Sequence, residues 1–231
     1  MFRDPQFTRR GLLAGLSSVG LGGIALAAEE ELPPPSNSEE ATQRLIAGNE
    51  RFVSGKTRHA HASHNWRLHL VGGQTPFATV LGCSDSRVPV ELVFDQGFGD
   101  LFVARVAGNV IAPEIVGTIE YAVTHLKTQL LVVLGHERCG AVTAAVQALD
   151  NPVQELPGLQ SLIKLIEPGV PPAVKEEPAA ARIRAAVEAN VRWSMKQLAR
   201  LPEAKKALDA EHIQIVGAVY ELNSGEVRWL K

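Results

Sequence analysis

The chain has 231 residues, of which 45% are hydrophobic and 21% charged, and its formal net charge at pH 7 is -2. A chain of this length and composition can bury a sizeable core, and its length predicts one domain or at most two small ones. With no excess of basic residues, the totals argue against binding to nucleic acid or to an anionic membrane surface, so the expected partner is a small molecule.

Residues 1–27 have the features of a secretory signal peptide. Arg9 and Arg10 precede an apolar, glycine-rich stretch at 11–26, and Ala25-Leu26-Ala27 provides the small residues of a cleavage site. The apolar stretch is shorter than the roughly 20 residues of a membrane span, so an uncleaved anchor is the weaker alternative. The paired arginines resemble a twin-arginine signal, whose pathway exports folded proteins. We therefore expect an exported protein without stable membrane insertion, in the periplasm or, if the source has thylakoids, in the thylakoid lumen.

Residues 28–37 are acidic and proline-rich, which predicts an extended linker. Beyond it we expect a single domain at 38–231. Its first element is a helix capped by Asn37 or Ser38 and ending near Gly55. The apolar stripe of this helix, for which the sequence offers no obvious packing partner, consists of Ala41, Leu45, Ile46, Phe52 and Val53.

Four histidines follow the first predicted helix: His59, His61, His64 and His69. Their spacing suggests a metal site, but no cysteine or carboxylate lies among them. A solvated, partly helical segment is therefore the favoured interpretation, with metal scavenging or proton relay as alternatives.

The rest of the chain alternates between predicted strands and helices. Apolar runs predict strands at 76–82, 101–106, 130–134 and 213–220, and 3.6-residue periodicity predicts helices at 113–126 and 182–201. A turn at Asn223-Ser224-Gly225 makes 227–230 an antiparallel partner of the preceding strand. Residues 150–180 are rich in Pro and Gly, which indicates a surface excursion. The predicted fold class is α/β, with a mostly parallel central sheet, flanking helices and a C-terminal antiparallel edge strand.

Two cysteines and a histidine follow two of these strands. Cys83 comes directly after the first strand, and His136 and Cys139 come at the end of the third. Because ligands bind at the carboxyl ends of parallel strands, the three residues are candidates for a zinc site with one open position. A disulfide between the cysteines, which export permits, and two inert buried cysteines remain as alternatives.

Asp85 and Arg87 share the turn that follows Cys83. A carboxylate beside a metal can accept a hydrogen bond from water or occupy the open position, and an arginine can hold that carboxylate ionised. A simple salt bridge within the turn is the alternative interpretation. The position of the Asp85–Arg87 pair beside a candidate metal ligand favours a catalytic role.

The motif Cys83-Ser84-Asp85-Ser86-Arg87, followed by Gly135-His136-Glu137-Arg138-Cys139-Gly140, resembles the β-class carbonic anhydrases. The similarity continues through 102–109 and 119–123 and covers most of the chain after residue 38. It implies an α/β fold with an N-terminal helical arm that wraps a partner subunit, and a homodimer or higher homo-oligomer. The helix at 41–53 would then have a partner surface to pack against.

The resemblance also implies a reaction and its residues. Cys83, His136 and Cys139 match the zinc ligands, and Asp85 with Arg87 matches the catalytic pair. One Zn²⁺ per subunit would activate water for attack on carbon dioxide to give bicarbonate. Asp85 would accept a hydrogen bond, and Arg87 would hold Asp85 off the metal. By the same resemblance, Gln74 and the backbone N–H of Gly140 are expected substrate contacts.

The sequence leaves some properties open. Val80 stands where relatives with a bicarbonate-binding regulatory pocket carry tryptophan, which argues against that pocket here. Relatives with the same fold hydrolyse carbon disulfide or carbonyl sulfide, and the metal motifs do not separate these activities. A catalytically silent, zinc-stabilised binding subunit is the alternative from another class, which the presence of both Asp85 and Arg87 disfavours.

Overall fold

The structure is a computed structural model that describes residues 33–151, 154–172 and 178–231. The predicted signal peptide at 1–27 and the first part of the predicted linker lie outside the described residues. Residues 33–231 form one compact unit. Within the described ranges, no helix combines the length and the apolar character that crossing a membrane requires.

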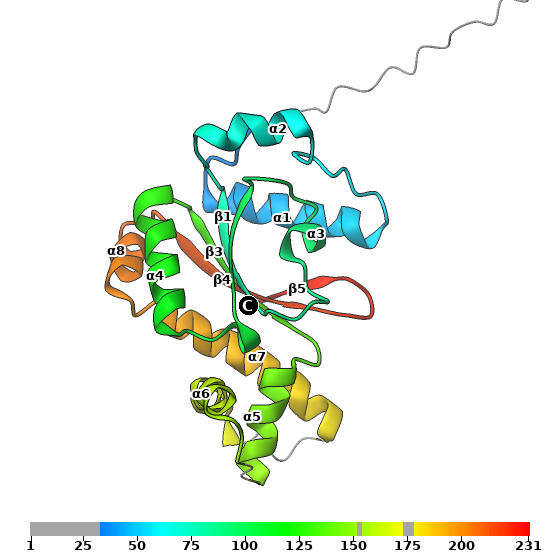
Figure 1. Ribbon diagram of the computed structural model, residues 1–231, viewed down its shortest axis with the longest axis vertical. Helices are drawn as coiled ribbons and strands as arrows, with labels where there is room; N and C mark the ends of the chain where they lie inside the picture. Colours follow the sequence, from blue (N-terminus) through cyan, green and yellow to red (C-terminus); the bar gives the residue numbers. More distant parts are fainter. Residues whose placement is uncertain (1–32, 152–153, 173–177) are drawn as a thin grey trace, which may run out of the picture. The chain divides into compact units, whose positions relative to one another are not determined.

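Five strands form one sheet, and helices flank it (Figure 1). The strands are β1 (Ala78–Gly82), β2 (Leu101–Arg105), β3 (Leu130–His136), β4 (Gln214–Tyr220) and β5 (Val227–Leu230). The helices are α1 (Ser38–Val53), α2 (His64–His69), η1 (Leu70–Gly72), α3 (Val90–Val93), η2 (Ala107–Asn109), α4 (Pro113–Tyr121), η3 (Ala122–Leu126), α5 (Gly140–Asp150), α6 (Pro157–Ile166), η4 (Glu167–Gly169), α7 (Ala179–Leu198) and α8 (Pro202–Asp209).

The strand order is β2-β1-β3-β4-β5, with parallel pairing throughout except between β4 and β5. This confirms the predicted α/β class and the antiparallel edge strand. All residues of β1 and β3 are buried, as expected for central parallel strands covered on both faces.

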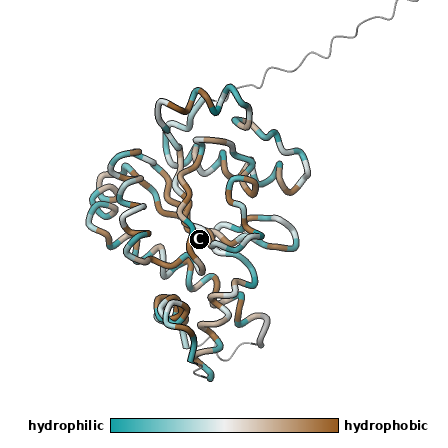
Figure 2. Tube along the Cα trace, viewed as in Figure 1, coloured by the Kyte–Doolittle hydropathy of each residue, from teal (hydrophilic) through white to brown (hydrophobic). Residues whose placement is uncertain are grey.

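Alternate residues of the central strands face two separate hydrophobic clusters. Leu81, Leu131 and Val133 belong to the cluster that includes α5 and α7, whereas Val80 and Val132 belong to the one that includes α1 and α3. In Figure 1, α1 and α3 lie on one side of the sheet and α4 and α7 on the other. Figure 2 shows the hydrophobic colour concentrated on the central strands. The metal-ligand candidates therefore follow strands that are buried along their whole length.

Helix α1 packs on its own chain, which answers the question that its apolar stripe raised. Asn37 caps it by accepting a hydrogen bond from the N–H of Glu40. The buried Asn49 donates to the carbonyls of Val93 (3.0 Å) and Gly225 (2.9 Å) and accepts from the N–H of Val227 (2.8 Å). One side chain thus joins α1 to α3 and to the hairpin of β4 and β5.

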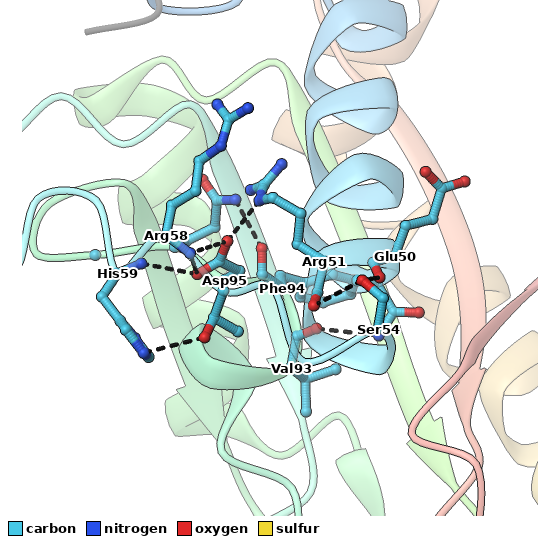
Figure 3. A network of polar contacts seen from close by, with 12 residues as sticks. Glu50, Arg51, Ser54, Arg58, His59, Val93, Phe94 and Asp95 are labelled. Atoms are coloured by element: carbon cyan, nitrogen blue, oxygen red, sulfur yellow. Dashed lines mark hydrogen bonds and ion pairs between the residues drawn. The ribbon is translucent and has the colours of Figure 1, made fainter. Parts of the chain in front are cut away.

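An ion pair fixes the chain after α1 (Figure 3). The buried Asp95 carboxylate accepts hydrogen bonds from Arg51 Nε at 2.6 Å and from the backbone N–H groups of Arg58 and His59 at 3.0 to 3.1 Å. Burial by itself would raise the pKa of Asp95, but the hydrogen bonds from these three donors outweigh it, and the net pKa lies below its usual value.

The sequence missed three local features. Short helices α3 and α8 were not predicted, because four and eight residues hold too little periodicity to be detected. The predicted helix at 113–126 is α-helical only to Tyr121 and continues as the π-helix η3, which ends at the left-handed Lys127. The segment that holds the four histidines is partly helical, as predicted, since α2 begins at His64.

Replacing Asp95 with Asn should lower the free energy of unfolding by about 3 kcal/mol. This value is at the low end of the range for breaking a buried ion pair, because the Arg51 side chain is partly exposed. The pKa of Asp95 is lower in the folded state, so its contribution is present above about pH 4 and is lost as the pH falls through the folded-state value. Urea unfolding should therefore show the gap between wild type and Asp95→Asn narrowing in acid.

The matched control is Asp209→Asn, which breaks the exposed pair with Lys205. This change should cost about 0.5 kcal/mol or less. Equal losses in the two variants would contradict the assigned role of Asp95.

Candidate metal centre

Parallel pairing of β1 with β3 brings the predicted ligands together. Gly82 lies opposite Leu134, so Cys83, the next residue, emerges beside the end of β3, where His136 is the last strand residue. Cys139 is the N-cap of α5 and closes the turn after β3. The ligand atoms of the three buried residues all lie within 4.8 Å of one another.

Both cysteines are free thiols, with their sulfur atoms 4.0 Å apart. The structure therefore does not contain the disulfide that the sequence left open. The hydrogen bond from Cys139, with smaller contributions that include the N–H groups of Gly108 and Asp85, outweighs the opposing effect of burial and lowers the pKa of Cys83 to about 4. The pKa of Cys139 shifts upward because it donates to Cys83. A thiol of lowered pKa beside a second sulfur is the donor chemistry that a thiophilic metal requires.

The imidazole of His136 presents a free lone pair to the sulfurs. Its Nδ1 lies 2.8 Å from the carbonyl oxygen of Glu137, which can only accept, so Nδ1 carries the proton. Nε2 is completely buried and has no hydrogen-bond partner in the described part of the chain. The nearest carboxylate oxygen, Asp85 Oδ2, is 3.8 Å away, too far for a hydrogen bond. An unpaired buried acceptor is costly, and a metal ion would satisfy it.

Arg87 holds Asp85 with two of its side-chain nitrogens. Arg87 Nε donates to Asp85 Oδ1 at 2.9 Å and Arg87 Nη2 donates to Oδ2 at 2.7 Å, while the N–H of Arg87 also donates to Oδ1. These hydrogen bonds from Arg87 hold the pKa of Asp85 well below its usual range, although partial burial opposes them. The carboxylate therefore stays ionised and directed at the guanidinium, beside the ligand cluster.

Two groups that the sequence analysis did not single out support the Cys83 turn. Arg105, at the end of β2, donates to the carbonyls of Cys83 (2.8 Å) and Asp85 (2.7 Å). The backbone N–H of Gly108 donates to Cys83 Sγ at 3.3 Å. The available signal was their position: Arg105 is the last residue of the strand that pairs with β1 and Gly108 follows that strand, so both reach the same edge of the sheet.

The two predicted substrate contacts lie in different places. Gly140 is the first residue of α5, next to Cys139, and is exposed. Gln74 is also exposed, but it precedes β1, so the whole strand separates it from Cys83. A five-residue strand is roughly 15 Å long, so Gln74 and Cys83 of one chain lie at opposite ends of the sheet.

The other candidate features lie away from the three ligands. Among the described residues, Cys83, His136 and Cys139 form the single converging group of three or more metal-type ligands, so the four histidines do not make such a cluster. A cavity of about 570 Å³ lies near the amino ends of β3 and β4, lined by residues that include Lys127, Gln129 and His212. None of the predicted site residues lines it.

Comparison with known proteins decides the family. The sequence model of the carbonic anhydrase family matches residues 78–227. The chain belongs to the β-class carbonic anhydrases. As a member of this enzyme family, it is 39% identical over 195 residues to "Carbonic anhydrase 2" of Mycobacterium tuberculosis, covering 83% of this chain and 92% of the relative. It is 40% identical over 197 residues to the carbonic anhydrase of Mycolicibacterium smegmatis, covering 84% and 94%.

Solved β-carbonic anhydrases share the fold. The β-carbonic anhydrase CcaA superposes with a TM-score of 0.66 at 30% identity, covering 80% of this chain and 86% of that one. CafA of Aspergillus fumigatus gives a TM-score of 0.65 at 27% identity, covering 82% and 90%. The part of the chain matched by the carbonic anhydrase family contains the three ligand candidates, Asp85, Arg87 and Gly140, and begins after Gln74.

Replacing His136 with Gln should reduce bound metal from about one equivalent to less than about a tenth, because one of the three ligand atoms is lost. Elemental analysis of purified protein measures this. The control is His64→Gln in the four-histidine segment, which should keep the wild-type metal content. Metal loss in the control with retention in His136→Gln would contradict the assignment.

Proposed function

We propose that this chain catalyses the reversible hydration of carbon dioxide to bicarbonate and a proton, with one Zn²⁺ per subunit held by Cys83, His136 and Cys139. The observation that carries the proposal is the buried, unpartnered Nε2 of His136, which lies within 4.8 Å of two free thiols. Two sulfurs and one imidazole suit zinc, and three protein ligands leave a position for water. Relatives at 39% and 40% identity that are named carbonic anhydrases support the reaction.

Bound zinc would supply the Lewis acidity that makes water nucleophilic near neutral pH. The chain's own residues do the rest. Asp85 accepts a hydrogen bond from the reacting water and so orients it. Arg87 donates one side-chain hydrogen bond to each carboxylate oxygen, which disfavours Asp85 as a ligand. The N–H of Gly140, at the first turn of α5, can donate to an oxygen of bicarbonate, and the start of a helix favours that negative charge.

Two other functions are distinguishable from this one. Hydrolysis of carbon disulfide or carbonyl sulfide would use the same residues, so it is tested by substrate. A silent, zinc-stabilised binding subunit would not need the Asp85–Arg87 pair, and the complete hydrogen bonding of that pair favours an enzyme.

We also propose that the chain acts as a homodimer or a higher homo-oligomer. Within one subunit, Gln74 lies at the far end of β1 from Cys83, so a contact between Gln74 and bicarbonate requires the Gln74 of a second subunit. Sedimentation velocity measures the oligomeric state. A protein that is monomeric by this measurement and fully active would contradict the proposal.

Asp85→Asn should lower kcat/KM for carbon dioxide hydration by about 10²-fold or more, because the group that orients water loses its charge. Stopped-flow measurement on the zinc-loaded protein tests this, with carbon disulfide as a parallel substrate. Asp150→Asn breaks a comparable Asp–Arg pair with Arg182, away from the ligands, and should keep wild-type activity. Absence of metal-dependent hydration in the wild type would overturn the proposed function, and turnover of carbon disulfide alone would establish the rival.

Export through the twin-arginine pathway is proposed from the sequence of residues 1–27. Replacing Arg9 and Arg10 together with Lys should leave the protein in the cytoplasm, as cell fractionation would reveal. Unchanged export of this variant would count against the pathway.

A further inference from the structure

The inward face of α7 carries two polar residues where its neighbours are apolar. Val187, Val191 and Leu198 on this face are buried in the core. Asn190 and Ser194, one turn apart on the same face, are exposed by only 1% and 0%. A buried polar group destabilises a core unless it is hydrogen-bonded, so these two side chains call for a specific partner.

Both side chains donate to the same short turn, η2. Asn190 Nδ2 donates to the carbonyl of Gly108 at 2.8 Å, and Ser194 Oγ donates to the carbonyl of Asn109 at 2.9 Å. The turn is unusual because two consecutive residues have left-handed backbones, with φ of 70° at Gly108 and 43° at Asn109. A Cβ at Gly108 would also press on the side chain of Ile166. This conformation persists only where its surroundings hold it, and α7 supplies two of the restraints.

In this conformation, η2 donates a hydrogen bond to Cys83, one of the three ligands of the proposed metal site. Gly108 accepts from Asn190 through its carbonyl and donates its own N–H to Cys83 Sγ at 3.3 Å. The hydrogen bonds therefore run without a break from α7 through η2 to the sulfur. An N–H directed at a thiolate fixes its orientation and tunes how strongly it donates to a metal.

We propose that Asn190 and Ser194 are positioning residues for the metal centre, which hold η2 so that the N–H of Gly108 stays directed at Cys83 Sγ. The inference rests on the metal site of the proposed function and extends it to residues that touch neither metal nor substrate. Packing alone does not account for Asn190: among the described residues its Oδ1 has no hydrogen-bond partner, so an apolar side chain of similar size would suit the core better. The feature of Asn190 that matters at this position is its Nδ2 group, which donates to Gly108.

The test compares Ser194→Ala and Asn190→Leu with Leu198→Ala. The first two remove one donor each, whereas the third truncates a buried side chain of α7 that makes neither hydrogen bond. Zinc transfer to a chromogenic chelator should be about tenfold faster in the two donor variants, as for other outer-shell partners of metal ligands. In cobalt-substituted protein, the sulfur-to-cobalt band should move to longer wavelength, because a thiolate with a weaker hydrogen bond donates more strongly.

The control separates stability from positioning. Leu198→Ala should lower Tm at least as much as the donor variants while keeping the wild-type transfer rate and spectrum. Donor variants that lose Tm but keep both readouts would overturn the inference and leave the metal site standing. If Asn190→Leu does not fold, Ser194→Ala, which removes a single oxygen atom, decides alone. A wild type that takes up neither zinc nor cobalt would overturn the proposed function and this inference with it.

Discussion

Parallel pairing of β1 with β3 is the constraint on which the site depends. Both strands are buried along their whole length, and the register places Gly82 opposite Leu134. Cys83 and His136 therefore leave the sheet at the same edge and in neighbouring positions. The backbone hydrogen bonds of two central strands hold this spacing, so the sheet itself positions the ligand candidates. A shift of the pairing by one residue would reverse which face each side chain occupies and separate the pair.

The electrostatics of the site follow from this crowding. The two free sulfurs lie 4.0 Å apart, and the buried Nε2 of His136, which has no hydrogen-bond partner among the described residues, lies close to them. A dication held by the three residues would satisfy both features, since it would stabilise thiolates at both sulfurs and pair with the imidazole nitrogen. The nearby Asp85 does not add its charge directly to the cluster, because Arg87 neutralises it.

The groups that support the Cys83 turn come from elements far apart in the chain. Arg105 at the end of β2 holds the carbonyls of Cys83 and Asp85, and η2 donates to the sulfur of Cys83. Helix α7 in turn restrains η2, and it also packs behind β3 and β4 through Val187 and Val191. The long helix thus links the rigidity of the sheet to the conformation of a strained turn beside the ligands.

The sequence by itself determined the fold class, the strand order along the chain and the three ligand candidates. These are recorded locally: apolar runs predict buried strands, and Cys83, His136 and Cys139 follow two of them. The sequence also indicated Asp85 and Arg87 as a candidate catalytic pair, because they share a turn with Cys83. The tertiary structure decided what local patterns cannot encode. It placed Gln74 at the far end of β1, packed α1 on its own chain through Asn49, and joined Asn190 to Gly108 across the core. Such contacts depend on which faces of distant elements meet, and no periodicity within a single segment specifies that.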